Sequence, residues 1–296
     1  MVITAHPGIF LYKGIFMHNL YILSNVAPYG TNHLMLLVIC LILMIILPII
    51  IKKTNISFNK ILNIMLILWI ISETIKLCSN VSYLLSDGSF VKIIEYEAKE
   101  GITIVRAFYP REELPFHLCS IQPIFMLIIK FSKSIKTQNI FKHFMFPTCL
   151  IGAFIALLVP TIDCEFTNPQ VYEYFLFHTA LIVFAISIVI TKQINITFKS
   201  HLETLTMLII MFIASIWINT LCSNTGQPYM GLETDEIYYT NFFFSMKPPI
   251  EGLPLLNLNH GWFVYLFNIV ALGVTLITLL QLPFIIKNHK NKISQN

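Results

Sequence analysis

A cysteine and two histidines stand out in this sequence because they lie just inside apolar stretches. His117 and Cys119 belong to the run LPFHLCS at residues 114–120, which opens an apolar stretch that continues to Phe131. His178 lies a similar distance into another apolar stretch further along the chain. A thiolate is a strong nucleophile, and a neighbouring imidazole lowers the pKa of a thiol and returns the proton to a leaving group. These residue types could therefore carry out acyl transfer.

Helix geometry favours His178 over His117 as the base for Cys119. Residues two apart lie ~200° apart around a helix, so His117 and Cys119 point to opposite faces unless a proline distorts the turn. Pro115 and Pro123 are placed where they could do so. Two simpler interpretations stay open: Cys119 is a packed core cysteine, and His178 makes a hydrogen bond between helices.

Further polar residues fall at a similar depth and predict one polar pocket near one face of the membrane. Polar groups at membrane depth cost free energy and mark candidate functional sites. Glu73 and Lys76 lie three residues apart, so they either line this pocket or form a structural ion pair. The spacing of His and Cys residues matches no zinc motif, so we expect neither a metal nor a cofactor. The predicted pocket-lining residues are His33, Glu73, Lys76, Asn219 and Lys247.

The composition requires a membrane to position these residues. Of the 296 residues, 56% are hydrophobic and 11% are charged, whereas soluble domains typically carry about 25% charged residues. Seven apolar segments are long enough, or nearly so, to cross a bilayer at about 1.5 Å per residue. The sequence therefore predicts an all-α, polytopic transmembrane helix bundle. We place the segments at about 33–51, 61–85, 114–131, 144–160, 172–191, 201–222 and 260–286.

The distribution of basic residues predicts the orientation. The connections on one side of the predicted bundle carry 12 Lys and Arg residues, and those on the other side carry 6. Because the positive side is normally cytoplasmic, we expect the N-terminus outside and the C-terminus inside. This gives an extracytoplasmic segment at 1–32, a single seven-helix transmembrane domain at 33–286 and a cytoplasmic tail at 287–296.

Composition also limits the partners and the setting. The net charge is only +4 and no basic stripe is interleaved with aromatic residues, which argues against nucleic-acid binding. We expect membrane lipids as partners and the cell membrane as the location, while the oligomeric state is not indicated. Lysine greatly outnumbers arginine, and isoleucine and asparagine are abundant. This bias is typical of an AT-rich genome and suggests a bacterial source.

Several of these residues fall in a pattern that resembles the YwaF family of bacterial integral membrane proteins. The pattern comprises PYGTNH at 28–33, the intramembrane Glu73, LPFHLC at 114–119, Phe177-His178 and the loop from Asn241 to Pro248. An aromatic–proline pair expected before the last span is replaced by HGWF at 260–263. The YwaF family is distantly similar to a eukaryotic transmembrane family assigned cysteine-dependent phospholipid acyl transfer. The resemblance implies an acyl thioester on Cys119, with His178 as the base.

Two functions remain in competition at this point. The first is a Cys/His-dependent lipid acyltransferase or lipid hydrolase at the outer leaflet, which uses Cys119 and His178. The second is a transporter or lipid-binding membrane protein in which Glu73, Lys76 and the histidines line a substrate or proton path. The two hypotheses differ in whether Cys119→Ser or Glu73→Gln abolishes function.

Overall fold

The computed structural model describes residues 28–92, 100–160, 166–223, 240–249 and 253–293. Most of the predicted N-terminal segment 1–32 and the end of the predicted C-terminal tail lie outside these residues. Six helices in the described parts are long and apolar enough to cross a membrane. They are α2 (Thr31–Thr54), α3 (Phe58–Asn80), α5 (Ile135–Leu158), α6 (Pro169–Ile190), α7 (Phe198–Cys222) and α8 (Trp262–Ile293). The prediction of a polytopic helical membrane protein is thereby confirmed.

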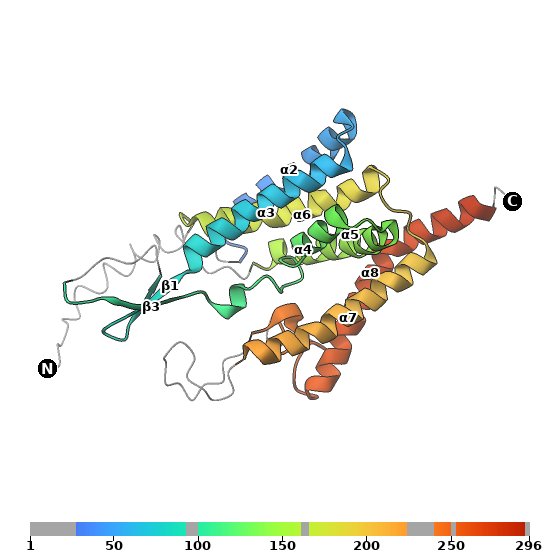
Figure 1. Ribbon diagram of the computed structural model, residues 1–296. Coiled ribbons are helices and arrows are strands. Elements are labelled where there is room, and N and C mark those ends of the chain that lie inside the picture. The colour runs from blue at the N-terminus through green and yellow to red at the C-terminus, as the bar shows by residue number, and fades with distance from the viewer. Residues whose placement is uncertain (1–27, 93–99, 161–165, 224–239, 250–252, 294–296) are drawn as a thin grey trace.

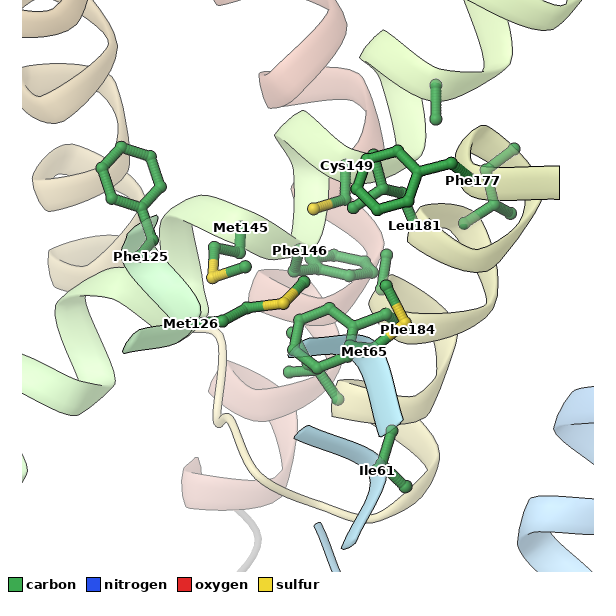
Figure 2. Close-up of a cluster of buried hydrophobic side chains, with 14 of the residues drawn as sticks. Ile61, Met65, Phe125, Met126, Met145, Phe146, Cys149, Phe177, Leu181 and Phe184 are labelled. Atoms are coloured by element: carbon green, nitrogen blue, oxygen red, sulfur yellow. The ribbon is translucent and has the colours of Figure 1, made fainter. Parts of the chain in front are cut away.

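The helices bury one set of apolar residues and leave another set exposed. Helix α6 packs against α2, α3 and α5, and these helices lie together in Figure 1. Figure 2 shows part of this core, in which Met65 of α3 lies beside Phe184 of α6 and Met145 of α5 lies beside Met126. On α2, by contrast, Leu, Val and Ile side chains such as Val38 and Ile42 are about half exposed. Such surfaces suit contact with lipid.

The two ends of the bundle differ in structure. At one end, called here the sheet end, α3 leads into a three-stranded antiparallel sheet with the order β2-β1-β3. The opposite end, called the lysine end, contains the short connections α2–α3, α4–α5 and α6–α7. Hydrogen bonds from Lys142 to Gln193 and from Asn288 to Asn195 join elements there. The strands are β1 (Ser82–Leu85), β2 (Phe90–Lys92) and β3 (Ile104–Phe108).

This sheet corrects the predicted second span, which was placed at 61–85. Helix α3 ends at Asn80, and residues 82–85 form strand β1 instead. Ser82 lies opposite Lys92 on one side and Phe108 on the other, so neighbouring strands satisfy the backbone groups of β1. These pairings are made with residues up to 26 positions away, which periodicity within the span could not reveal.

The predicted third span, 114–131, crosses the bundle but is helical over only its second half. A 3-10 helix, η1 (Arg111–Glu113), follows β3 at the sheet end, and residues 114–121 then form a series of turns. Only α4 (Gln122–Phe131) is an α-helix, and Lys130 near its end hydrogen-bonds Asn63 of α3. Pro115 disfavours a helical residue before it, whereas Pro123 is tolerated in the first turn of α4. We call residues 114–131 the broken span.

The predicted fourth span, 144–160, begins too late. Helix α5 begins at Ile135, because polar residues of its first turns have partners at the lysine end. Lys142 reaches Gln193, and both ring nitrogens of His143 lie within hydrogen-bond distance of the Asn139 and Asn195 carbonyls. Helix α8 likewise extends to Ile293, beyond the predicted boundary at 286.

Candidate functional site

A cluster of charged side chains surrounds Lys76 at the sheet end of the bundle. The Lys76 ammonium lies 2.9 Å from the Glu73 carboxylate on the same face of α3. Its charge also interacts with Glu113 and with His117 of the broken span. On α6 it interacts with Glu173 and His178. We call these six residues the Lys76 cluster: Glu73, Lys76, Glu113, His117, Glu173 and His178.

Hydrogen bonds hold the carboxylates of this cluster in place. Ser72 of α3 donates to the Glu173 carboxylate of α6, which joins two helices at membrane depth. The Trp69 indole N–H donates to Glu73 over 3.3 Å. A buried carboxylate without such donors would be costly. The hydrogen bonds therefore hold two of the three carboxylates of the cluster, those of Glu73 and Glu173, near the Lys76 ammonium.

Two titratable groups lie where β3 leads into the broken span. Burial is the main cause that raises the pKa of the Glu113 carboxyl, and the nearby Lys76 ammonium opposes this rise. Burial also raises the pKa of the Tyr109 hydroxyl, with a contribution from the negative charges of Glu113, Glu73 and Glu173. Both groups are therefore favoured in their neutral forms by burial.

The two predicted histidines are brought together and share an unusual bonding pattern. His178 Nδ1 lies 2.7 Å from the Tyr174 carbonyl, which can only accept, so Nδ1 carries the proton and Nε2 is left as a base. The side chain of His117 similarly bonds the backbone of Glu112. The charges of His117 and His178 interact with each other.

The other buried histidines in the described residues use both ring nitrogens. His33 accepts from the Tyr29 amide and bonds the Leu157 carbonyl, each over 2.8 Å. His143 bonds two carbonyls, and His201 bonds Gln281 together with a threonine hydroxyl. Each of these three histidines is therefore engaged in structural contacts. Within the described residues, His117 and His178 differ from these three histidines because each has one ring nitrogen without a hydrogen-bond partner.

Cys119 lies in the last turns before α4, where its half-buried thiol faces α5. A Cβ atom built on Gly152 of α5 would lie 3.3 Å from the Cys119 sulfur, and the Cys149 thiol is close enough to interact with it. The Cys119 thiol makes no hydrogen bond to either histidine among the described residues. The structure thus brings the two histidines together. The Cys119 thiol is two residues further along the chain from His117 and is not hydrogen-bonded to either ring.

The backbone around Cys119 has unused donors. The Ile121 amide bonds the His117 carbonyl, so a first helical turn begins before α4. The amides of Leu118, Cys119 and Ser120 donate to no described residue. Unbonded amides at a helix N-terminus, together with the helix dipole, attract negative charge. The broken span therefore presents a thiol and several N–H donors at one position.

Three predicted pocket residues, His33, Asn219 and Lys247, lie outside the Lys76 cluster. His33 bonds the end of α5, as described above. The Asn219 amide makes four hydrogen bonds to Thr240, Phe242 and Ser245, and these attach residues 240–245 to α7. Lys247 is exposed, and its carbonyl accepts from Tyr265.

The attached loop nevertheless touches the broken span. The ring of Phe242, which lies in η2 (Phe242–Phe244), packs edge-on at 4.9 Å from the His117 ring and at 5.5 Å from the Phe116 ring. Asn219 thus supports the broken span through Phe242. No group of three His, Cys, Asp or Glu residues in the described chain could hold a metal ion.

Sequence reasoning missed Ser72 and Glu113 as members of this site, and it placed Glu173 at the start of a span without including it among the predicted pocket-lining residues. Glu113 lies before the apolar run, where a charged residue does not stand out, and the structure leaves it half-buried. The contact between Ser72 and Glu173 joins residues 101 positions apart, and the sequence next to Ser72 does not indicate so distant a partner. Only the packing of α3 against α6 reveals it.

Comparison with known proteins identifies the family. A family model described as the TMEM164 family matches residues 28–281, which include the Lys76 cluster, the broken span and five of the six long helices in full. No curated protein and no solved structure matches the chain. The family match replaces the predicted YwaF assignment and does not support a bacterial source. With its six apolar helices of membrane-spanning length, the chain is a multipass membrane protein that belongs to the TMEM164 family.

Proposed function

We propose that this protein is an intramembrane lipid acyltransferase or lipid hydrolase in which Cys119 is the nucleophile and His178 is the base. The observation that carries the proposal is the break in the span at residues 114–121, which leaves Cys119 beside unbonded backbone amides. A non-helical backbone at membrane depth is tolerated only where protein or a polar cavity surrounds it. A cysteine used only for packing would not need such a break.

The amides near Cys119 supply the electrostatics that the reaction needs. Negative charge develops first on the sulfur and then on the carbonyl oxygen of the substrate, and backbone N–H groups stabilise both. Removing one such donor typically costs about 10²–10³ in rate in other enzymes that use an oxyanion hole. The amides of Leu118 and Ser120 flank the thiol and are suited to this role.

His178 supplies the proton transfers. Its Nε2 is free to accept a proton because Nδ1 donates to the Tyr174 carbonyl. The thiol must move toward this ring when substrate binds, since catalytic hydrogen bonds are often long without substrate and tighten in the complex. His117 lies closer to Cys119 in the chain and is the alternative base.

The reaction proceeds in two steps, acylation of Cys119 and then transfer of the acyl group to a lysolipid or to water. The Cys119 thiol gives its proton to His178 while the sulfur attacks a lipid ester carbonyl. The tetrahedral intermediate expels the lysolipid oxygen, which takes that proton and leaves an acyl thioester. A lysolipid hydroxyl or water then attacks the thioester, His178 takes the proton of the attacking group, and the sulfur leaves and regains a proton. Such a cycle gives ping-pong kinetics.

The acyl-enzyme provides the test. Protein purified from cells fed an alkyne-tagged fatty acid should carry a hydroxylamine-sensitive acyl group on Cys119. The label should be lost in Cys119→Ser and His178→Gln. It should remain in Cys149→Ser, which changes the neighbouring thiol, and in His143→Gln, which changes a histidine with a structural role. An unlabelled wild-type protein, even with lipid donors added, would refute the proposal.

A transporter is the second candidate, and the Lys76 cluster favours it. Discontinuous helices with charged residues at membrane depth are typical of binding sites for ions and substrates in transporters. In that case Glu73→Gln should abolish flux in proteoliposomes while Cys119→Ser preserves it. The acyltransferase proposal requires the reverse for the acyl label: Glu73→Gln should keep it.

A further inference from the structure

A cavity of about 440 Å³ lies at the lysine end, far along the bundle from Cys119. The first turn of α3, the end of α4, the first half of α5 and the α6–α7 connection surround it, and Lys130, Lys142 and Gln193 contribute side chains to its wall. The volume falls in the range of small-molecule sites, about 300–1,000 Å³, and exceeds what a single ion needs. No acidic residue is among its lining residues.

Lys142 is a buried cation without an anionic partner in the described residues. Its side chain is 8% exposed, and its ammonium lies 3.5 Å from the Gln193 amide oxygen and 4.9 Å from the centre of the Phe58 ring. Lys76 at the other end, by contrast, has the Glu73 carboxylate as its partner at 2.9 Å. A buried charge is costly unless it is paired. An anion in the cavity would provide the missing counter-charge.

The start of α3 adds donors to the same cavity. Ser57 is the N-cap residue, but its hydroxyl caps no amide, and the amides of Phe58 and Asn59 donate to no described residue. All three residues line the cavity. Helix N-termini with free amides bind phosphate groups readily. The ammonium of Lys130 contributes a second positive charge, with only a neutral amide oxygen of Asn63 as its partner in the described residues.

We propose that this cavity binds a phosphate ester. Two lysines, the free amides of α3 and the absence of lining acids all favour a compact anion with several acceptor oxygens. Two sources share this chemistry: the headgroup of a phospholipid in the adjoining leaflet, and a water-soluble phosphate ester. The site is independent of Cys119, because its contacts involve no residue of the Lys76 cluster and none of residues 114–121.

Binding by the purified full-length protein in a phosphate-free detergent tests the proposal. The probes are dioleoyl phosphatidic acid, dioleoylglycerol, which lacks the phosphate, and glycerol 3-phosphate. Wild-type protein should bind phosphatidic acid more tightly than dioleoylglycerol. Binding of phosphatidic acid alone would identify a lipid headgroup as the source, and tight binding of glycerol 3-phosphate would identify a soluble ester.

Matched lysine variants locate the binding site. Lys142→Met keeps the length of the side chain and removes its charge, so it should weaken phosphate binding about tenfold or more. Lys130→Met should also weaken binding, and it keeps the test decisive if Lys142→Met does not fold. Lys133→Met removes an exposed lysine at the same end and should have no effect.

Three outcomes would overturn the proposal. The first is a folded wild-type protein that binds neither phosphate-bearing probe. The second is equal affinity for dioleoylglycerol and phosphatidic acid. The third is unchanged binding in the folded Lys142→Met and Lys130→Met variants. None of these results depends on acyl transfer at Cys119, so the two proposals can fail separately.

Discussion

Cys119 and Cys149 are neighbouring thiols that differ in burial and in the hydrogen bonding of the backbone around them, and therefore in their suitability as nucleophiles. Cys149 is fully buried within α5, where helical hydrogen bonding uses the backbone amides. Cys119 is half-buried and precedes α4, where the amides are unbonded. A nucleophile needs both access for a substrate and donors for the oxyanion. Of this pair, Cys119 is the less buried residue and the one with unbonded amides beside it, and the two thiols are close enough to interact.

The position of the Cys119 thiol can be tested through Gly152. In Gly152→Ala the new Cβ would lie 3.3 Å from the sulfur, so the thiol must shift by a few tenths of an ångström. Because small misplacements can cost up to ~10²-fold in rate, acyl labelling should fall at least several-fold. Stability should not fall, since Ala favours a helix over Gly by about 1 kcal/mol. The measurements are hydroxylamine-sensitive label and thermal midpoint.

Gly273→Ala is the matched control for this change. Its Cβ would meet only the flexible end of Leu208, at 3.4 Å, in another part of the bundle. It should leave the acyl label unchanged. Full labelling of Gly152→Ala would mean that the placement of the sulfur against α5 is irrelevant to the reaction.

At the scale of elements, hydrophobic runs predict the long helices well and the broken span poorly. Helices α6 and α7 begin within three residues of their predicted starts at 172 and 201. The apolar composition of residues 114–121 predicts the start of a helix, whereas the structure has turns there. Their shape depends on distant packing, since Phe242 covers Phe116 and His117 from more than 120 residues further along the chain.

For the candidate site too, the sequence predicts the residues but not the distant contacts that decide their roles. Glu73, Lys76, His117 and His178 could be predicted because titratable residues stand out within apolar runs, and the structure brings these four together. Asn219 stands out in the same way, yet its amide bonds are used to attach a loop. Residue type and position in an apolar run therefore identify candidate polar residues. The hydrogen-bond partners seen in the structure are needed to separate functional candidates from residues that hold the fold together.

Asn219→Ala tests how strongly residues 240–245 support the broken span. The change leaves the buried Phe242 amide without an acceptor, which should cost about 1–3 kcal/mol of unfolding free energy. Because Phe242 packs on His117, the acyl label should fall as well. Thr220→Ala, next to it on the exposed face of α7, should change neither quantity. An unchanged thermal midpoint in Asn219→Ala would show that the loop does not depend on this side chain.

At the scale of the whole molecule, the two ends of the bundle carry different chemistry. The sheet end holds the Lys76 cluster beside Cys119, and the lysine end holds the cavity with Lys130 and Lys142. Helix α2 begins at the sheet end and α8 ends at the lysine end, as Figure 1 shows. A protein oriented by its basic residues would have Cys119 near the outer leaflet and the cavity near the inner leaflet.

Labelling with a membrane-impermeant maleimide in intact cells decides this orientation. Ser89→Cys places a thiol in the exposed turn between β1 and β2, and Lys133→Cys places one in the α4–α5 connection. Both are made with Cys78→Ser and Cys222→Ser, which remove an exposed and a half-buried native thiol, and with Cys164→Ser. We expect Ser89→Cys to react in intact cells and Lys133→Cys to react only after permeabilisation. The reverse pattern would place Cys119 at the cytoplasmic leaflet, and its acyl donors would then have to come from that leaflet or from the cytosol.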